Sequence, residues 1–568
     1  MNIINRLLIV LSCAICSTVS LAQTSDPKIT SWLLDASGGY ARLYESDAAL
    51  NSGTAATTWS RGAGAQSTAV YAGVSQVQYA TDWVYVRTTG LGYHVMGPWY
   101  RNTARTQLFP NFPSNQNAIY RIPRTPTVPV TKTLTNAGAI GYGVDGVALF
   151  DNRDTFSYAN ASSIDGSPAS GQRGDGIWNR DAYINEAVTF DPAYAHQAGS
   201  NYHYHANTPA LRYLLGDHVE YNASSRTYTE SSAAVTEHSP ILGWMADGYP
   251  VYGPYGYSSA MDANSGVRRM ISGYVKRDGT SGSTNLNATG RTTLPTWATT
   301  AQNRSSVLTS GQYGPAVSST YILGHYLEDY DYLGDLGKTQ GTDFDLDLYN
   351  GRFCVTPEFP GGTYAYFLSI EANGTPKFPY IIGRWFYGSP SGGTVANITG
   401  TVTEQERGAP TQAITLSGTT SGSSVALVWN SAEGATYKME SSANGTAWTQ
   451  LSSSITSSGA STTYTTPLAN YYRVTLTAIA TYDTSAVVGV PVGTTAILEY
   501  TASGSEATGE VSDETSSTTT TTTNTSTSTA AATPATTSSG GGGGAPSHWF
   551  VGALATLALM RCKLRLRR

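Results

Sequence analysis

The chain has little cysteine and little charge. It carries only 4 cysteines among 568 residues, and 13% of its residues are charged. Two of those cysteines, Cys13 and Cys16, fall in an N-terminal segment that we expect to be removed. A scaffold built on disulfides is thereby excluded, so the fold must be stabilised by burial of apolar surface. The formal net charge is −6 and no basic patch precedes the C-terminal tail, which argues against nucleic acid as a partner.

The usual signatures of hydrolases and nucleotide-binding proteins are also missing. No serine lies in a G-x-S-x-G motif, and H-E-x-x-H does not occur. The apolar periodicity of helices is scarce. Polar and apolar residues instead alternate in runs such as 79–86, 364–370 and 425–429, between clusters of turn-forming residues. The sequence therefore predicts a mainly β protein.

Both ends of the chain indicate export. Asn5 and Arg6 precede an apolar run, and a small-x-small cleavage site ends at Ala22, which predicts a signal peptide over 1–22. Residues 501–545 are mostly Thr, Ser, Ala and Gly, a composition typical of a disordered linker.

The tail over 546–568 joins a short motif, an apolar run that predicts a short helix, and a basic end. This order resembles the C-terminal sorting tails of Gram-negative bacteria. The resemblance implies cleavage by a sorting protease and delivery to the outer membrane, the cell surface or the medium. An ordinary membrane anchor is the alternative, although the apolar run is short for a transmembrane helix.

The remainder divides at Gly392-Gly393. We expect an N-terminal β segment over 23–66, a β-rich main domain over 67–390 and a small β-sandwich over 395–500. In the last part, Trp429, Tyr437 and Tyr472 occupy strand-like runs and are expected in the core. This pattern resembles a fibronectin type III-like module, which implies a spacer or surface-contact role.

Tyr202-His203-Tyr204-His205 is the strongest chemical signal in the chain. The sequence has only 8 histidines, and two of them stand two residues apart here. On a strand, His203 and His205 would share one face, with Tyr202 and Tyr204 on the other. Imidazole nitrogen is a ligand for copper and zinc, and no retained cysteine lies near the motif. The sequence therefore predicts a copper or zinc site, with both metals left open.

Further ligands must come from elsewhere, because such sites need three or four protein ligands. His238, just before a Ser-Pro step, is the first candidate. Asp247 could ligate the metal or accept the second ring N–H of a histidine ligand, and His196 is a weaker candidate. Tyr202 and Tyr204 are also expected to ligate the metal or to support its ligands. The alternatives are a structural pairing of His and Tyr side chains in a half-buried sheet, or acid–base chemistry without a metal.

A second cluster is acidic. Three carboxylates alternate with apolar side chains, at Asp343, Asp345 and Asp347. A strand would place them on one face, where calcium would neutralise their repulsion. A solvated edge face is the alternative.

A series of short segments occurs in one order between residues 67 and 389. They are Gly-Pro-Trp at 97–99, Tyr-Arg-Ile-Pro-Arg at 120–124, residues 143–152, Asn-Tyr-His-Tyr-His at 201–205, His-Ser-Pro-Ile at 238–241, residues 247–257, and Asn-Gly-Arg-Phe at 350–353. This region resembles the YHYH family of exported bacterial proteins. The resemblance delimits a domain and implies export, but it implies no settled activity.

Two functions follow from these features. The first is an exported, cell-surface metal-binding protein, held to the cell envelope through its tail. The second is a non-enzymatic surface adhesion or glycan-binding protein with a structural His/Tyr motif, whose partner would be an extracellular glycan or a small molecule.

Overall fold

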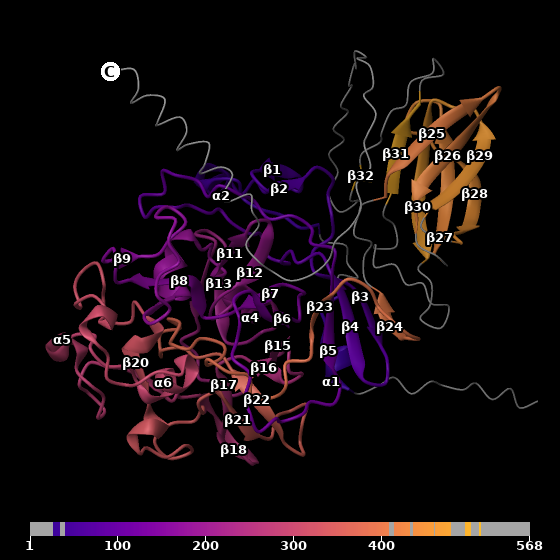
Figure 1. Cartoon of the computed structure of the whole chain (residues 1–568). Coiled ribbons are helices and arrows are strands. Elements are labelled where there is room, and N and C mark those ends of the chain that lie inside the picture. Colours follow the sequence, from indigo (N-terminus) through magenta and orange to yellow (C-terminus); the bar gives the residue numbers. More distant parts are fainter. Residues whose placement is uncertain are drawn as a thin grey trace, which may run out of the picture.

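The computed structural model describes residues 26–34, 40–407, 414–431, 435–458, 461–478, 495–500 and 511–512. Strands dominate and the helices are short, so the prediction of a mainly β protein is confirmed (Figure 1). The predicted signal peptide and C-terminal apolar helix lie outside the described residues. Within the described ranges, no helix combines the length and the hydrophobicity needed to cross a bilayer.

A mixed eight-stranded sheet forms the centre of the larger region. Its strands run in the spatial order β11 (Ala195–Ala198), β12 (Asn201–Tyr204), β7 (Ala148–Phe150), β6 (Ala139–Gly143), β15 (Ile241–Met245), β16 (Pro250–Tyr252), β22 (Thr363–Phe367) and β21 (Gly351–Cys354). β12 pairs in parallel with β7 and antiparallel with β11. The motif strand β12 therefore lies one position inside the sheet edge, because only β11 lies beyond it.

A five-stranded sheet lies beside the central one. It orders β23 (Gly393–Val395), β5 (Ala118–Pro123), β4 (Trp83–Thr88), β3 (Val74–Tyr79) and β24 (Thr403–Arg407). The alternating run at 79–86 crosses the turn between β3 and β4. β23 and β24 pair with β5 and β3, so the chain adds two outer strands to this sheet after the Gly392-Gly393 break.

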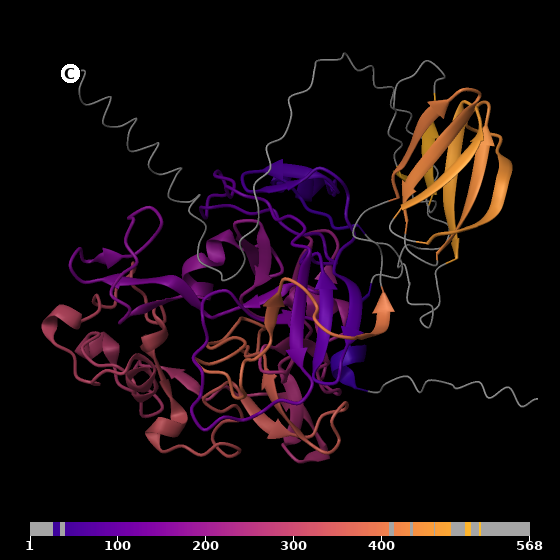
Figure 2. The ribbon, with the colours of Figure 1, turned by 45° about the vertical axis from the view of Figure 1, so that its right-hand side comes forward.

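Two smaller sheets form the β-sandwich near the end of the described chain. One orders β25 (Leu416–Ser421), β26 (Ser424–Asn430) and β29 (Ser461–Pro467); the other orders β28 (Thr449–Thr456), β27 (Thr436–Ser442), β30 (Tyr471–Ala478), β31 (Thr495–Glu499) and β32 (Val511–Ser512). Trp429, Tyr437 and Tyr472 are buried in the core of the sandwich, as large aromatics there should be, and Tyr71 of the larger region joins this core. β32 falls within the range predicted as linker. Figure 2 shows the sandwich standing to one side of the larger region.

The remaining elements are short. They are α1 (Pro27–Thr30), α2 (Asp47–Ser52), α3 (Ala182–Glu186), α4 (Pro209–Leu214), α5 (Leu286–Thr289), α6 (Thr296–Gln302), the 3-10 turns η1 (Ala187–Thr189), η2 (Ser310–Gln312), η3 (Leu327–Asp329) and η4 (Leu333–Leu336), and the strands β1 (Trp59–Arg61), β2 (Gly64–Gln66), β8 (Arg153–Ala159), β9 (Ile164–Asp165), β10 (Asn179–Asp181), β13 (Val219–Asn222), β14 (Thr227–Glu230), β17 (Tyr255–Ser259), β18 (Asp262–Arg269), β19 (Tyr274–Lys276) and β20 (Tyr330–Tyr332). One apolar core joins most of them, and it includes Ile29, Trp32 and Trp59. The N-terminal segment thus packs into the same core as the main domain.

Candidate metal centre

A tight hairpin places two histidines side by side. β11 and β12 are joined by Gly199 and Ser200, and His196 lies directly opposite His203. Gly199 adopts φ +63, a left-handed conformation that glycine reaches without steric cost in such a loop.

His205 completes the group one residue after β12. Its Nε2 lies 2.9 Å from Nε2 of His203. One ligand atom from each of the three histidines lies within 4.8 Å of the others, and all three residues are buried. His203 and His205 therefore meet on one face of the strand.

The opposite ring nitrogens of His203 and His205 face backbone oxygens, which favours one tautomer of each ring. Nδ1 of His203 lies 2.9 Å from the backbone oxygen of Asn201, and Nδ1 of His205 lies 3.3 Å from that of Asp151. A carbonyl oxygen can only accept, so both Nδ1 atoms carry the hydrogen in the neutral rings. In that tautomer the two Nε2 atoms that face each other have lone pairs and no hydrogen to share.

His196 is oriented in the same way by a hydroxyl group. The Thr189 hydroxyl donates to the backbone oxygen of Glu186 at 2.6 Å, and its oxygen lies 2.7 Å from Nδ1 of His196. Because the only hydroxyl hydrogen is already used, Nδ1 of His196 must donate. All three Nε2 atoms are thus free to bind a cation, and oxygen partners on the far side of the rings are a recurrent feature of metal-ligating histidines.

Glu186, the last residue of α3, brings a carboxylate to the group. Its Oε2 lies 3.3 Å from Nε2 of His205 and 3.6 Å from Nε2 of His196. Burial, and then the negative charge of Asp154, raise the pKa of Glu186 to about 8. The Glu186 side chain remains 27% exposed, so it lies on the solvent side of the group.

Aromatic rings form the walls of the site. Phe150 stacks on His203 with 3.7 Å between ring centroids, and Phe190 stacks on His205 at 5.4 Å. Burial lowers the pKa of His205 to about 4 and the pKa values of His196 and His203 well below their usual range. The three imidazoles are therefore neutral at pH 7, which is the form that binds metal.

The two tyrosines of the motif point to the opposite face. The Tyr202 hydroxyl donates to Asp191 at 2.7 Å, and the Tyr204 hydroxyl donates to Asp145 at 2.8 Å. Both rings are fully buried. This face is occupied by hydrogen-bonded pairs and offers the metal no ligand.

His238 and Asp247 do not join the histidine group. They flank β15, the third strand from β12 in the sheet, roughly 14 Å away at ~4.8 Å per strand. The His238 ring packs against the rings of Tyr252, Tyr257 and Phe367. Asp247 accepts hydrogen bonds from the Tyr366 hydroxyl and the Gly388 amide. The sequence favours His238 and Asp247 because turn-forming residues flank them, and that local feature does not report their distance from β12.

The acidic run does not form a strand. Its residues make only isolated bridges, through Phe344 and Leu346, so the predicted alternation of faces is wrong. Asp345 pairs with Arg268 at 2.6 Å, Asp347 accepts from the Tyr364 hydroxyl, and Asp343 accepts from the Thr339 amide. Each carboxylate has its own partner, and the structure does not bring the three together as a calcium site.

A comparison of the chain with known protein families finds a match that includes the Tyr-His-Tyr-His motif at 202–205. Residues 119–381 match the model of the family described as YHYH protein. This YHYH match contains all three histidines and Glu186, and it supports the family resemblance for this part of the chain. It starts after the predicted domain start at 67, so the Gly-Pro-Trp motif lies outside it. No curated protein and no solved structure matches the chain. The fibronectin type III-like and sorting-tail resemblances remain predictions.

The sequence indicates His196 only as a weaker ligand and does not identify Glu186. The Gly199-Ser200 pair between alternating runs is a two-residue hairpin signal, and it would have placed His196 opposite His203. No comparable signal exists for Glu186, because the packing of α3 against β8 and β10, not the local pattern, brings its carboxylate to the histidines.

Proposed function

We propose that this protein is an exported metal-binding protein whose centre takes copper or zinc. The observation that carries the proposal is the state of the three Nε2 atoms. Each imidazole is tied through Nδ1 to an oxygen, and the Nε2 atoms of His203 and His205 face each other at 2.9 Å without a hydrogen between them. Two lone pairs at that distance repel, and a shared cation turns the repulsion into two bonds.

The donor set narrows the class of metal. Three imidazole nitrogens suit zinc and copper, whereas calcium and magnesium take oxygen ligands. Glu186 is the natural fourth ligand, since its carboxylate lies beside His196 and His205. Because that carboxylate lies on the solvent side, its displacement by water or a small molecule would open a coordination position there.

A purely structural role for the motif is the competing interpretation. A structural pair of imidazoles would place an N–H between the rings, and the arrangement here directs both N–H groups away. We also propose export to the cell surface and attachment through the C-terminal tail, on the strength of the sequence features at both ends.

The metal content of the mature chain, purified from Gln23 onward, tests the proposal. Elemental analysis should find close to one equivalent of copper or zinc, and calorimetric titration of the stripped protein should restore it with submicromolar affinity. A folded, metal-free protein that binds neither ion would overturn the proposal and return the histidines to a structural role.

A further inference from the structure

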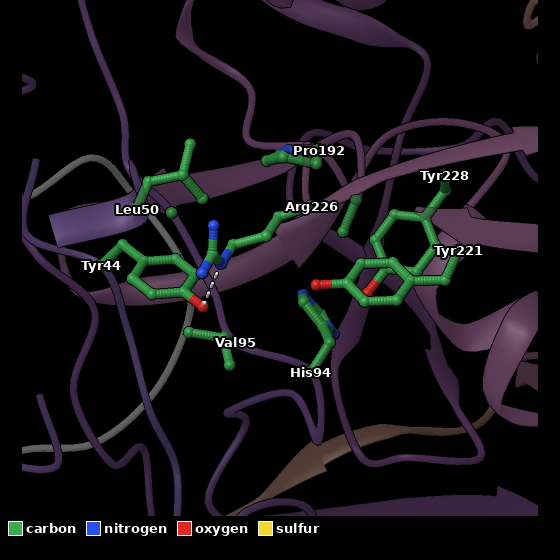
Figure 3. Close-up of a pocket in the computed structure, with 10 residues that line it drawn as sticks. Tyr44, Leu50, His94, Val95, Pro192, Tyr221, Arg226 and Tyr228 are labelled. Carbon is green, nitrogen blue, oxygen red and sulfur yellow. Dashed lines mark hydrogen bonds between the residues drawn. The ribbon is translucent and has the colours of Figure 1, made fainter. Parts of the chain in front are cut away.

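A hollow lies on the tyrosine side of β12, away from the histidine group. It measures about 290 Å³ with its solvent-open part included, and His94, Arg226, Tyr221 and Tyr228 are among its lining residues. Figure 3 shows the His94 ring and the Tyr221 hydroxyl pointing into the space that the Arg226 guanidinium also reaches. None of the three metal-centre histidines lines it.

Arg226 brings a positive charge to the hollow. Arg226 donates from Nε to the Tyr44 hydroxyl at 3.2 Å, which leaves the two terminal nitrogens of its fork available. In the part of the chain that the structure describes, no carboxylate forms an ion pair with Arg226 or with Arg42, whose charge acts on His94. A planar guanidinium fork matches the two oxygens of a carboxylate.

His94 adds a hydrogen-bond acceptor. The single hydroxyl hydrogen of Tyr202 goes to Asp191, so the contact of 2.8 Å between Tyr202 and Nε2 of His94 requires that Nε2 carry the hydrogen. Burial and the charge of Arg42 lower the pKa of His94 to about 3, so the ring is neutral. Nδ1 is left as a lone pair that can accept from a hydroxyl group.

Exposed tyrosines extend the hollow into a platform. Tyr221 and Tyr228 are cross-strand partners on β13 and β14, with ring centroids 4.9 Å apart, and the Tyr213 ring lies 5.6 Å from that of Tyr221. Tyr213 and Tyr221 are 46% and 36% exposed, which is unusual for clustered aromatic rings. Flat aromatic surfaces beside polar groups suit the apolar face of a sugar ring.

We infer that this hollow binds the carboxylate of an acidic saccharide. Arg226 pairs with the carboxylate, His94 accepts from a sugar hydroxyl, and the tyrosine platform of Tyr213, Tyr221 and Tyr228 stacks on the ring. A ligand that satisfies all three features must carry an anion, hydroxyl groups and a partly apolar face. The inference goes beyond metal binding and does not depend on it.

Titration of the full mature chain with oligogalacturonate, and with the same oligosaccharide fully methyl-esterified, tests the inference. The two probes share their rings and differ in the charge of the carboxyl group, so the acid should bind at least tenfold more tightly. Removing the metal with a chelator should leave this affinity unchanged. Equal binding of both probes, or no binding of the acid at millimolar concentration, would overturn the inference.

Two variants locate the interaction. Arg226→Gln should weaken binding of the acid more than tenfold, and Tyr221→Ala should weaken it severalfold. Arg304→Gln, at an exposed arginine outside the hollow, is the matched control and should bind as the wild type does. Melting temperatures verify that each variant is folded. Wild-type affinity in a folded Arg226→Gln protein would refute the assignment.

Discussion

The two faces of β12 come from alternating residues of one short segment, yet they are satisfied in opposite ways. On the tyrosine face, each hydroxyl donates to a buried carboxylate. On the histidine face, three Nε2 atoms converge beside the Glu186 carboxyl group. A completed polar network fixes the position of a strand, whereas three converging lone pairs with only the Glu186 carboxyl beside them, among the described residues, cost stability until a ligand binds them. The tyrosine face therefore holds the strand in place, and the histidine face is arranged to bind a ligand.

Backbone strain accompanies the histidine face. Tyr194 and Thr208, which flank β11 and the end of the motif, adopt φ +57 and φ +42 although neither is glycine. Left-handed conformations of such residues cost about 1–3 kcal/mol each and persist where the surrounding structure enforces them. Nine other residues of the described chain that are not glycine also have positive φ, so this strain is not confined to the histidine face.

Among the variants that distinguish the two faces, His203→Ala should have the largest effect, a loss of metal affinity. Removing one of three nitrogen ligands should weaken copper or zinc binding on the order of 1000-fold, about 4 kcal/mol, while the fold remains. Calorimetric titration of wild type and variant measures this. His238→Ala is the matched control, because that ring packs among Tyr252, Tyr257 and Phe367, and its metal affinity should stay at the wild-type level. If His238→Ala lost most of its metal affinity while His203→Ala kept the wild-type affinity, the metal site would lie at His238 and not at the histidine face.

Glu186→Gln tests whether the fourth ligand on the histidine face is Glu186. The amide keeps the size of the side chain but cannot lose a proton to become a carboxylate ligand, so metal affinity should fall about 10- to 100-fold. Competition with a chelator of known affinity gives the value. Glu220→Gln, on the exposed strand β13, serves as the charge-matched control. An affinity that does not change would place Glu186 outside the coordination sphere.

Tyr204→Phe should act on stability and spare the metal. Loss of its hydroxyl removes a hydrogen bond from the buried Asp145 carboxylate, at a cost of about 1–3 kcal/mol in the free energy of unfolding. Chemical denaturation of the metal-free protein measures the loss, with Tyr313→Phe at an exposed site as the control. Metal affinity should change less than about threefold. A large drop in metal affinity without a loss of stability would mean that the two faces do not differ as described.

The sequence predicted what depends on local pattern. The period of two placed His203 and His205 on one face and the tyrosines on the other, and the alternating runs indicated a mainly β chain. The Gly199-Ser200 pair also indicates a hairpin that brings His196 opposite His203, although the sequence indicates His196 only as a weaker ligand.

Tertiary packing decided the rest. Glu186 comes from α3, and no periodicity reports how a helix packs against a sheet. His238 lies three strands from β12 because β7 and β6 intervene, an order that cannot be derived from the spacing of residues along the chain. The shared face predicted for the acidic run is wrong for a related reason. Arg268, Tyr364 and a backbone amide each bind a different carboxylate of the run, so residues that alternate in sequence do not share one face.

The smallest expected effect concerns pH and the tyrosine face alone. Burial raises the pKa of Asp145 to about 6, although the Tyr204 hydroxyl and the Val147 amide oppose the shift. An aspartate in the unfolded chain titrates near ~3.9, so between that value and pH 6 the folded protein retains a proton that the unfolded chain has lost. Rising pH therefore favours unfolding, and the wild type should lose about 1 kcal/mol relative to Asp145→Asn between pH 5 and pH 7. Denaturation curves of both metal-free proteins at the two pH values measure the difference. A wild type that instead gains stability over this range, relative to the variant, would show that Asp145 is ionised and well solvated, and the tyrosine face would then not be the closed network described here.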